Sequence, residues 1–172
     1  MKQKTLKSSF TLKGQGLHTG YRIEITFNPA PVDSGYRIKR VDLEDQPVIE
    51  AVAENVVHTQ RGTVLGMGNI TVSTVEHAFS TLYALGIDNC LIEVNAPEFP
   101  ILDGSAIEYI RAIEKAGIAE QEKDKDFYVV RKKIEVSDSE TGSKITLLPD
   151  DGFAINSNIE FESQYIPNQY AS

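Results

Sequence analysis

The hydrophobic pattern of this chain changes its period partway along, and that change limits the folds available to it. Residues 21–31, "YRIEITFNPAP", alternate apolar and polar side chains, as a strand with one buried face does. From Val75 onward, the apolar side chains recur at Phe79, Leu82 and Leu85, which is the spacing of an amphipathic helix. A run of strands followed by helices predicts an α+β domain.

The rest of this pattern predicts further strands and a second helix, over residues 105–117. Its core-facing residues are expected to be Ile107, Ile110 and Ile113, and Gly117 is expected to end it, as Gly86 ends the first helix. The other predicted strands cover residues 8–14, 35–41, 47–57 and 90–94, with a hairpin over 63–72 that turns at Gly66 to Asn69.

Both predicted helices begin with the pattern Ser-x-x-Glu, at Ser73 to Glu76 and at Ser105 to Glu108. At this spacing the serine and the glutamate each accept a hydrogen bond from the other's free backbone N–H. We therefore expect a reciprocal capping box at the start of each helix.

A charged stretch after the second helix predicts a domain boundary. We expect a first α+β domain over residues 1–119, a charged linker over 120–126, and the start of a second domain over 127–172. Strand patterns return in this last part at residues 127–136, 143–149 and 152–161.

The returning pattern echoes the beginning of the chain. "TGYRIEITFNP" at residues 19–29 and "TGSKITLLPDD" at 141–151 both contain Thr-Gly, a basic residue, alternating aliphatic residues and then a proline before a turn. A second copy of the same strand-first unit is therefore predicted. Because no helical pattern follows it, we expect the copy to be incomplete and the chain to be the N-terminal portion of a longer protein.

Charge and cysteine content argue against several classes of function. The formal net charge of the 172 residues is −8 and the pI is about 4.9, whereas a nucleic-acid partner requires a basic face. The single cysteine, Cys90, excludes a disulfide framework, and its apolar neighbours predict a buried, inert thiol. Because we find neither a secretory signal nor an apolar run of transmembrane length, we expect a cytoplasmic protein.

Glu76 and His77 stand side by side at the start of the first predicted helix. The helix dipole there favours a carboxylate and disfavours an imidazolium, so the pair suits a general base beside a metal ligand. Two other interpretations stay open, in which Glu76 only caps the helix and His77 is only solvated. A zinc site built from all three histidines, His18, His58 and His77, is a further alternative, although no local ligand spacing supports it.

Several segments together resemble one family, the UDP-3-O-acyl-N-acetylglucosamine deacetylases, which are zinc amidases of lipid A biosynthesis in Gram-negative bacteria. The segments are "GQGLHTG" (14–20), "FNPAPVDSGYRIKRVD" (27–42), "STVEHAFSTLYALGIDNCLIEVNAPEFPILDGSA" (73–106) and "IPNQYA" (166–171). The sequences of these segments are most similar to those of the version that some bacteria fuse to a hydroxyacyl-carrier-protein dehydratase.

The resemblance implies a fold and a set of site residues. The family fold is two similar two-layer α/β sandwiches, packed helix layer against helix layer with the active site between them. By the match of motifs, His77 corresponds to a zinc ligand and Glu76 to the general base that activates the zinc-bound water. Leu17 and His18 correspond to residues of the substrate cleft, and Thr59 to a threonine near the metal.

The sequence also departs from the family pattern. The family's other zinc ligands lie in a later motif similar to H-K-x-x-D, and a further histidine near the family's C-terminus protonates the leaving group. This chain has no histidine after His77, and His58 matches no family site. We therefore expect the chain by itself to retain no zinc and to have no deacetylase activity.

Two partners and one alternative function follow from this interpretation. The expected partners are the UDP-acyl-sugar substrate and the remainder of the deacetylase chain, and the exposed helix faces are expected to favour self-association. The alternative is a natural short relative that keeps the fold as a non-catalytic binding module.

Overall fold

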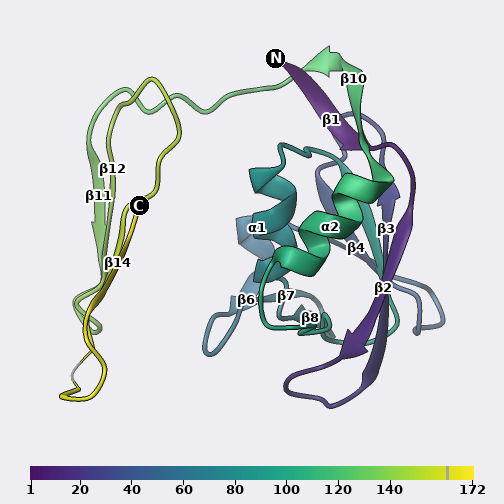
Figure 1. Ribbon diagram of the computed structural model, residues 1–172, viewed down its shortest axis with the longest axis horizontal. Helices are drawn as coiled ribbons and strands as arrows, with labels where there is room; N and C mark the ends of the chain where they lie inside the picture. The colour runs from purple at the N-terminus through teal and green to yellow at the C-terminus, as the bar shows by residue number, and fades with distance from the viewer. Residues whose placement is uncertain (162) are drawn as a thin grey trace. The chain divides into compact units, whose positions relative to one another are not determined.

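The computed structural model describes residues 1–161 and 163–172, and these divide into two units, Met1–Lys125 and Asp126–Ser172. Figure 1 shows the first unit in purple to green and the second in green to yellow. Both predicted helices lie in the first unit, which also holds a five-stranded sheet. Among the described residues, neither helix is long and apolar enough to cross a membrane.

The five-stranded sheet has the strand order β2-β3-β9-β4-β5. Neighbouring strands within this sheet are antiparallel, except that β4 and β9 run parallel to each other. The strands are β2 (Phe10–Gln15), β3 (Arg22–Pro29), β9 (Cys90–Val94), β4 (Tyr36–Arg40) and β5 (Val48–Glu50). All five overlap segments that the sequence predicted as strands, and only β2 extends beyond its predicted segment, by one residue.

Two smaller sheets complete the first unit. One is a three-stranded sheet in which β7 lies between β6 and β8, and the other pairs β1 with β10. The β7–β8 hairpin turns at Gly68 and Asn69, as predicted, and Gly68 takes a positive φ of 59° there. The elements are β1 (Lys2–Leu6), η1 (Ala53–Asn55), β6 (Val56–His58), β7 (Val64–Met67), β8 (Ile70–Ser73), α1 (Glu76–Ala84), α2 (Ile107–Ala116) and β10 (Ile118–Asp124).

One face of the five-stranded sheet packs against both helices and forms the core (Figure 1). Along β3, Ile23, Ile25 and Phe27 are buried, while Glu24 between them is exposed, so the strand presents one apolar and one polar face. The core also contains Ile38 and Ile92 of the sheet, Ala78 and Leu82 of α1, and Tyr109 and Ile113 of α2. The first unit is therefore a two-layer α+β structure, and the predicted fold class is confirmed.

The predicted capping box at Ser73 and Glu76 is wrong. Helix α1 begins at Glu76 with no side-chain hydrogen bond from its N-cap residue, Val75. Ser73 is the last residue of β8, and its hydroxyl donates to the carbonyl of Pro97 (3.3 Å). The Glu76 carboxylate accepts the backbone N–H of Thr63 (3.2 Å), because the β6–β7 loop lies beside the helix start.

The second predicted capping box forms only in part. The Ser105 hydroxyl accepts a hydrogen bond from the backbone N–H of Ile107 (3.2 Å) at the start of α2. The backbone N–H of Ser105, which Glu108 was expected to bind, donates instead to the carboxylate of Asp103 (2.9 Å). A nearer acceptor therefore replaces the predicted reciprocal bond.

The core-facing side of α2 differs from the prediction. Tyr109 and Ile113 are buried, Ile110 is half-buried, and Ile107 is 38% exposed. Tyr109 and Ile113 are four residues apart and so lie on one face, whereas Ile107 precedes Tyr109 by two residues and points away from that face. The Tyr109 hydroxyl donates to the carbonyl of Pro100 (3.1 Å), which satisfies its polar end within the core.

The charged segment predicted as a linker over 120–126 is a strand over most of its length. Residues Ile118–Asp124 form β10, which pairs antiparallel with β1. The buried amide of Asn89 donates to the side chains of Gln121 and Gln3 (both 2.8 Å), so that hydrogen bonds hold the pair of strands to the rest of the unit. The sequence pattern missed β10 because its outward side chains are charged and its inward contacts are polar.

The second unit consists of two antiparallel hairpins, β11–β12 and β13–β14. The strands are β11 (Ile134–Ser137), β12 (Lys144–Leu147), β13 (Ser157–Ile159) and β14 (Gln169–Ala171). Each strand pattern predicted in this region overlaps one of the first three, whereas β14 was not predicted. Large apolar side chains such as Phe153, Ile155 and Ile145 are exposed here. On the two helices of the first unit, by contrast, only Tyr83 and Ile107 belong to the exposed large apolar residues that the structure describes.

The packing of β3 predicts how two neighbouring substitutions differ. Ile25 has no exposed surface, so Ile25→Ala is expected to lower the free energy of unfolding by about 2–5 kcal/mol. Glu24→Ala, on the opposite face, removes only a surface ion pair with Lys13 and is expected to cost less than about 1 kcal/mol. Urea titration followed by circular dichroism measures both changes. Equal losses in the two variants would contradict the two-layer packing.

Candidate functional site

Glu76 lies at the first position of α1, where the loop between β6 and β7 meets the helix. Its carboxylate accepts the N–H of Thr63, and the neighbouring Gly62 leaves room for it, since a Cβ there would lie 3.2 Å from Glu76 Oε1. Gly62 and Arg61 both take positive φ angles, of 149° and 61°, which turn the loop toward the helix. The loop that carries Thr59 therefore lies against Glu76, while the Thr59 side chain itself is exposed.

His77 is half-buried and directly follows Glu76 on the helix. Its carbonyl accepts hydrogen bonds from the hydroxyls of Thr81 (2.8 Å) and Ser80 (3.1 Å). Its imidazole makes no hydrogen bond or ion pair with any residue that the structure describes. The unprotonated ring nitrogen of a neutral imidazole is therefore free of described partners and can coordinate a metal ion.

The loop that carries Leu17 and His18 is held by a buried carboxylate that the sequence analysis did not single out. Glu98 has no exposed surface and accepts the backbone N–H groups of His18 and Thr19 (both 2.9 Å) and the Thr19 hydroxyl (2.7 Å). Thr74, two residues before Glu76, donates its hydroxyl to the same carboxylate (3.3 Å). Glu98 therefore joins the His18 loop to the segment that leads into α1.

These hydrogen bonds determine the charge of Glu98. Burial by itself raises the pKa of a carboxyl, but the donors from His18 and Thr19 outweigh it, so the pKa of Glu98 lies below its ordinary value. An ionised carboxylate with four hydrogen bonds is satisfied in the interior, whereas an unpaired one would be strongly destabilising. The hydrogen bonds of Glu98 therefore hold the His18 loop and Thr74 at one ionised carboxylate.

Thr74 is held in a strained conformation at the same junction. Its φ is 60°, in the left-handed region, which a β-branched residue rarely adopts and which costs on the order of 1–3 kcal/mol. Thr74 is buried and bonded to Glu98, so the surrounding structure imposes the conformation. The sharp turn lets β8 end at Ser73 and α1 begin at Glu76, with only two residues between them.

The structure thus brings some of the predicted site residues together and leaves others at a distance. Glu76 and His77 lie beside the Thr59 loop, and Glu98 connects the His18 loop to Thr74. Leu17 is 60% exposed and His18 is also exposed, and neither side chain makes a described contact with Glu76 or His77. Glu98 stands between prolines and apolar residues, in "APEFPI", and this apolar context is the sequence signal that could have indicated a buried, hydrogen-bonded carboxylate.

The described residues do not form a complete metal site. Within residues 1–161 and 163–172, no group of three or more His, Cys, Asp or Glu side chains is placed to hold a metal ion. A catalytic zinc requires about three protein ligands, so His77 could supply one ligand and the residues present do not fit the whole site. The alternative zinc site made from His18, His58 and His77 is likewise unsupported; His58 is exposed at the end of β6.

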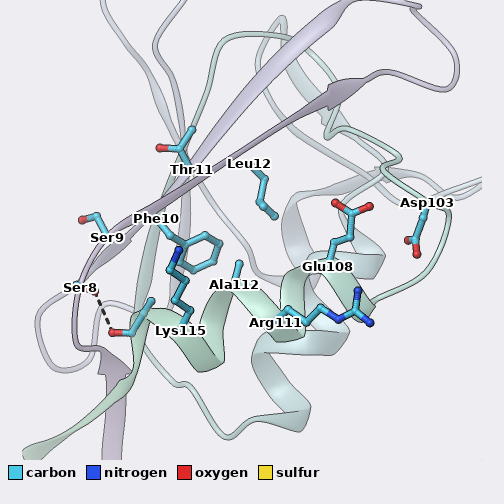
Figure 2. Close-up of a pocket in the computed structure, with 11 residues that line it drawn as sticks. Ser8, Ser9, Phe10, Thr11, Leu12, Asp103, Glu108, Arg111, Ala112 and Lys115 are labelled. Atoms are coloured by element: carbon cyan, nitrogen blue, oxygen red, sulfur yellow. Dashed lines mark hydrogen bonds between the residues drawn. The ribbon is translucent and has the colours of Figure 1, made fainter.

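A separate groove lies between β2 and α2 (Figure 2). Figure 2 shows Lys115 of the helix extending toward Phe10, while Arg111 extends along the helix to the side where Asp103 lies. The Ser8 hydroxyl donates to the carbonyl of Ala116 (2.9 Å). None of the predicted site residues lines this groove, so it is distinct from the candidate site.

Comparison with known proteins gives matches over nearly the whole chain. The model of the family described as LpxC, UDP-3-O-acyl N-acetylglycosamine deacetylase, matches residues 3–172. The bifunctional enzyme LpxC/FabZ of Porphyromonas gingivalis is 60% identical over 171 residues, which are 99% of this chain and 37% of that protein. The bifunctional enzyme LpxC/FabZ of Bacteroides thetaiotaomicron is 58% identical over 172 residues, again 37% of its length.

A relative named as the deacetylase alone also matches. The UDP-3-O-acyl-N-acetylglucosamine deacetylase of Teredinibacter turnerae is 44% identical over 162 residues, which are 94% of this chain and 53% of that protein. The chain thus spans about 37% of the length of the bifunctional relatives and about half that of the single-function one.

The lowered pKa of Glu98 predicts a pH-dependent contribution to stability. A carboxyl whose folded pKa is depressed stabilises the fold above its unfolded pKa, and this contribution is lost as the pH falls through the folded pKa. Glu98→Gln is therefore expected to lower the free energy of unfolding at pH 7, with the difference from wild type shrinking below the ordinary titration range of glutamate. Urea titrations from pH 7 to pH 3 measure this, and a pH-independent difference would contradict it.

The burial of Cys90 predicts a thiol that does not react in the folded protein. Cys90 has no exposed surface, and burial raises the pKa of its thiol to about 12, so almost no thiolate exists at pH 8. Labelling by Ellman's reagent at pH 8 is expected only after unfolding in guanidinium. Rapid labelling of the folded protein would show that β9 is accessible and would contradict the prediction of an inert thiol.

Proposed function

Because the chain belongs to the UDP-3-O-acyl-N-acetylglucosamine deacetylase family, as its motifs predicted, we propose that it is the N-terminal portion of such an enzyme. The complete protein would hydrolyse the acetamide of UDP-3-O-(3-hydroxyacyl)-N-acetylglucosamine to the free amine and acetate, in the cytoplasm and for lipid A biosynthesis. The observation that carries the proposal is the placement of Glu76 and His77 at the first turn of α1, where the Glu76 carboxylate accepts the N–H of Thr63 from the loop that also carries Thr59.

Glu76 is proposed as the general base. Its carboxylate lies at the N-terminus of α1, where the helix dipole stabilises negative charge, and the N–H of Thr63 holds one of its oxygens. The carboxylate would take a proton from water, and the resulting hydroxide would add to the acetamide carbonyl. The C–N bond of the tetrahedral intermediate then breaks, the amine nitrogen gains a proton, and acetate leaves.

His77 is proposed as one zinc ligand, through an imidazole that is free of other described partners. Zinc, when bound, supplies a Lewis acid that makes water more acidic and polarises the carbonyl. Since His77 is one ligand and about three are needed, we propose that the others come from parts of the protein outside these 172 residues. The chain by itself would then bind no stoichiometric zinc and have no activity.

Leu17, His18 and Thr59 are proposed as substrate-binding residues. All three are exposed on loops whose backbones are fixed, the first loop by Glu98 and the second by its contact with Glu76. An exposed apolar residue such as Leu17 on a preorganised loop can contact a ligand at little entropic cost.

The second unit is proposed as the beginning of a second, similar α+β domain. This unit exposes Ile145, Ile155, Tyr165 and other large apolar side chains, which would be buried if they formed part of a core. The remainder of the deacetylase would complete this core, and without it these residues would favour self-association.

The proposal predicts a clear difference between the complete protein and this chain. With UDP-3-O-acyl-N-acetylglucosamine as substrate, release of acetate is expected from the zinc-loaded complete protein and not from the 172-residue chain. In the complete protein, Glu76→Gln is expected to lower kcat by about 100-fold or more with zinc content unchanged, since a general base contributes about that much. His77→Gln is expected to reduce the zinc content, as measured by atomic emission.

Glu24→Gln is the matched control, because Glu24 is exposed on the opposite face of the sheet. Turnover by the 172-residue chain would refute the need for further ligands. An unchanged kcat in Glu76→Gln would remove Glu76 from the reaction, and an unchanged zinc content in His77→Gln would remove His77 from the metal site.

A further inference from the structure

Two loops of this chain, one in each unit, are built in the same way. The first loop, residues 16–21, joins β2 to β3 after the pair Gln15 and Arg22. The second loop, residues 138–143, joins β11 to β12 after the pair Ser137 and Lys144. Both therefore have the same length, and both carry Thr-Gly at their fourth and fifth positions.

The backbone hydrogen bonds of the two loops agree. In the first loop, Gly16 N–H donates to the carbonyl of Tyr21 (3.0 Å), and Gly20 N–H donates to the carbonyl of Gly16 (3.1 Å). In the second loop, the residues at the same positions make the same two bonds, Asp138 to Ser143 (2.8 Å) and Gly142 to Asp138 (2.9 Å).

The conformations and the threonine side chains agree as well. The glycine at the fifth position has a φ of 68° at Gly20 and of 71° at Gly142. The threonine at the fourth position accepts the N–H of the sixth residue in both loops, at 3.3 Å for Thr19 and 3.2 Å for Thr141. The two loops thus share one conformation, and a difference between them should have a specific cause.

The two loops differ in which residue supplies the carboxylate that binds their third and fourth residues. In the second loop the first residue, Asp138, accepts the N–H of Glu140 (2.9 Å) and the hydroxyl of Thr141 (2.8 Å), at the third and fourth positions. In the first loop the third and fourth positions are His18 and Thr19, and their N–H and hydroxyl donate to Glu98, which lies far along the chain.

Gly16 makes room for this distant carboxylate. A Cβ at Gly16 would collide with Glu98 Oε2 and with the Thr19 hydroxyl, the two groups that form the bond. The φ of Gly16 is outside the left-handed region, so the backbone there accepts any residue. Both groups of this bond therefore favour glycine at position 16. Once Glu98 is removed and the Thr19 hydroxyl shifts, an aspartate there could hold the loop in place of Glu98.

An aspartate within the loop would lack one contact that Glu98 makes. Glu98 also accepts the hydroxyl of Thr74, whose left-handed conformation sets the start of the Glu76 helix. We propose that Glu98 is a positioning residue for the deacetylation reaction, which fixes the His18 loop and the Thr74 turn with one carboxylate and so sets the substrate-binding loop relative to Glu76. This proposal rests on the proposed function.

The test is a double-mutant cycle in the complete protein, with Glu98→Ala, Gly16→Asp and the double variant. Glu98→Ala is expected to raise KM and to lower kcat, each by about tenfold or more, because charge-assisted hydrogen bonds are lost. Gly16→Asp alone is expected to lower the Tm, because its side chain meets Glu98. In the double variant the Tm is expected to exceed that of either single variant, and KM is expected to return to within a few-fold of wild type while kcat stays low.

A double variant less stable than both single variants would overturn the equivalence of the two loops. Full recovery of kcat in the double variant would show that the Glu98–Thr74 hydrogen bond does not contribute to the reaction. If Glu98→Ala does not fold, the Tm of the double variant is compared with that of Gly16→Asp alone. A higher Tm in the double variant then supports the equivalence of the two loops, and a lower one contradicts it. Glu24→Ala is the control for loss of an exposed charge. The Tm values need no turnover, so an inactive wild type would refute the proposed function and leave the loop comparison intact.

Discussion

The buried carboxylate of Glu98 is the interaction on which the arrangement of the candidate site depends. It accepts four hydrogen bonds, three from the His18–Thr19 loop and one from Thr74, so these two segments meet at the ionised group that Glu98 provides. A buried charge is stable only when its hydrogen bonds are complete, and removing one donor leaves a large penalty. Loss of any one of these donors is therefore expected to weaken the connection between the loop and the helix start.

The two-layer core gives this interaction a rigid support. The central strands β3 and β9 bury Ile25, Phe27 and Ile92 under the two helices, while Glu24 lies on the outer face of β3. Helix α1 packs on this face through Ala78 and Leu82, so Glu76 and His77 at its first turn project at the end of a fixed element. Site residues at the ends of rigid elements and on short loops keep their geometry before a ligand arrives.

Much of the fold could be predicted from the sequence, and the errors have local causes. Period-two alternation found β3 and β4, and helical spacing found α1, because in these segments apolar periodicity coincides with burial. The pattern failed for β10, whose inward contact is Gln121 to Asn89 and carries no apolar signal. The predicted cap at Ser73 failed because Pro97 and Thr63, distant in the sequence, offered better partners to Ser73 and Glu76.

The sequence by itself determined the fold class, the elements of the sheet and the identity of Glu76 and His77 as candidate residues, because periodicity and local motifs depend on neighbours along the chain. Only the tertiary structure decided that Glu98 holds the His18 loop, that Thr74 is strained beside Glu76, and that the described residues supply no complete metal site. Such contacts join residues up to eighty positions apart in the sequence. Their partners are chosen by folding, which brings together donors and acceptors that no local pattern connects.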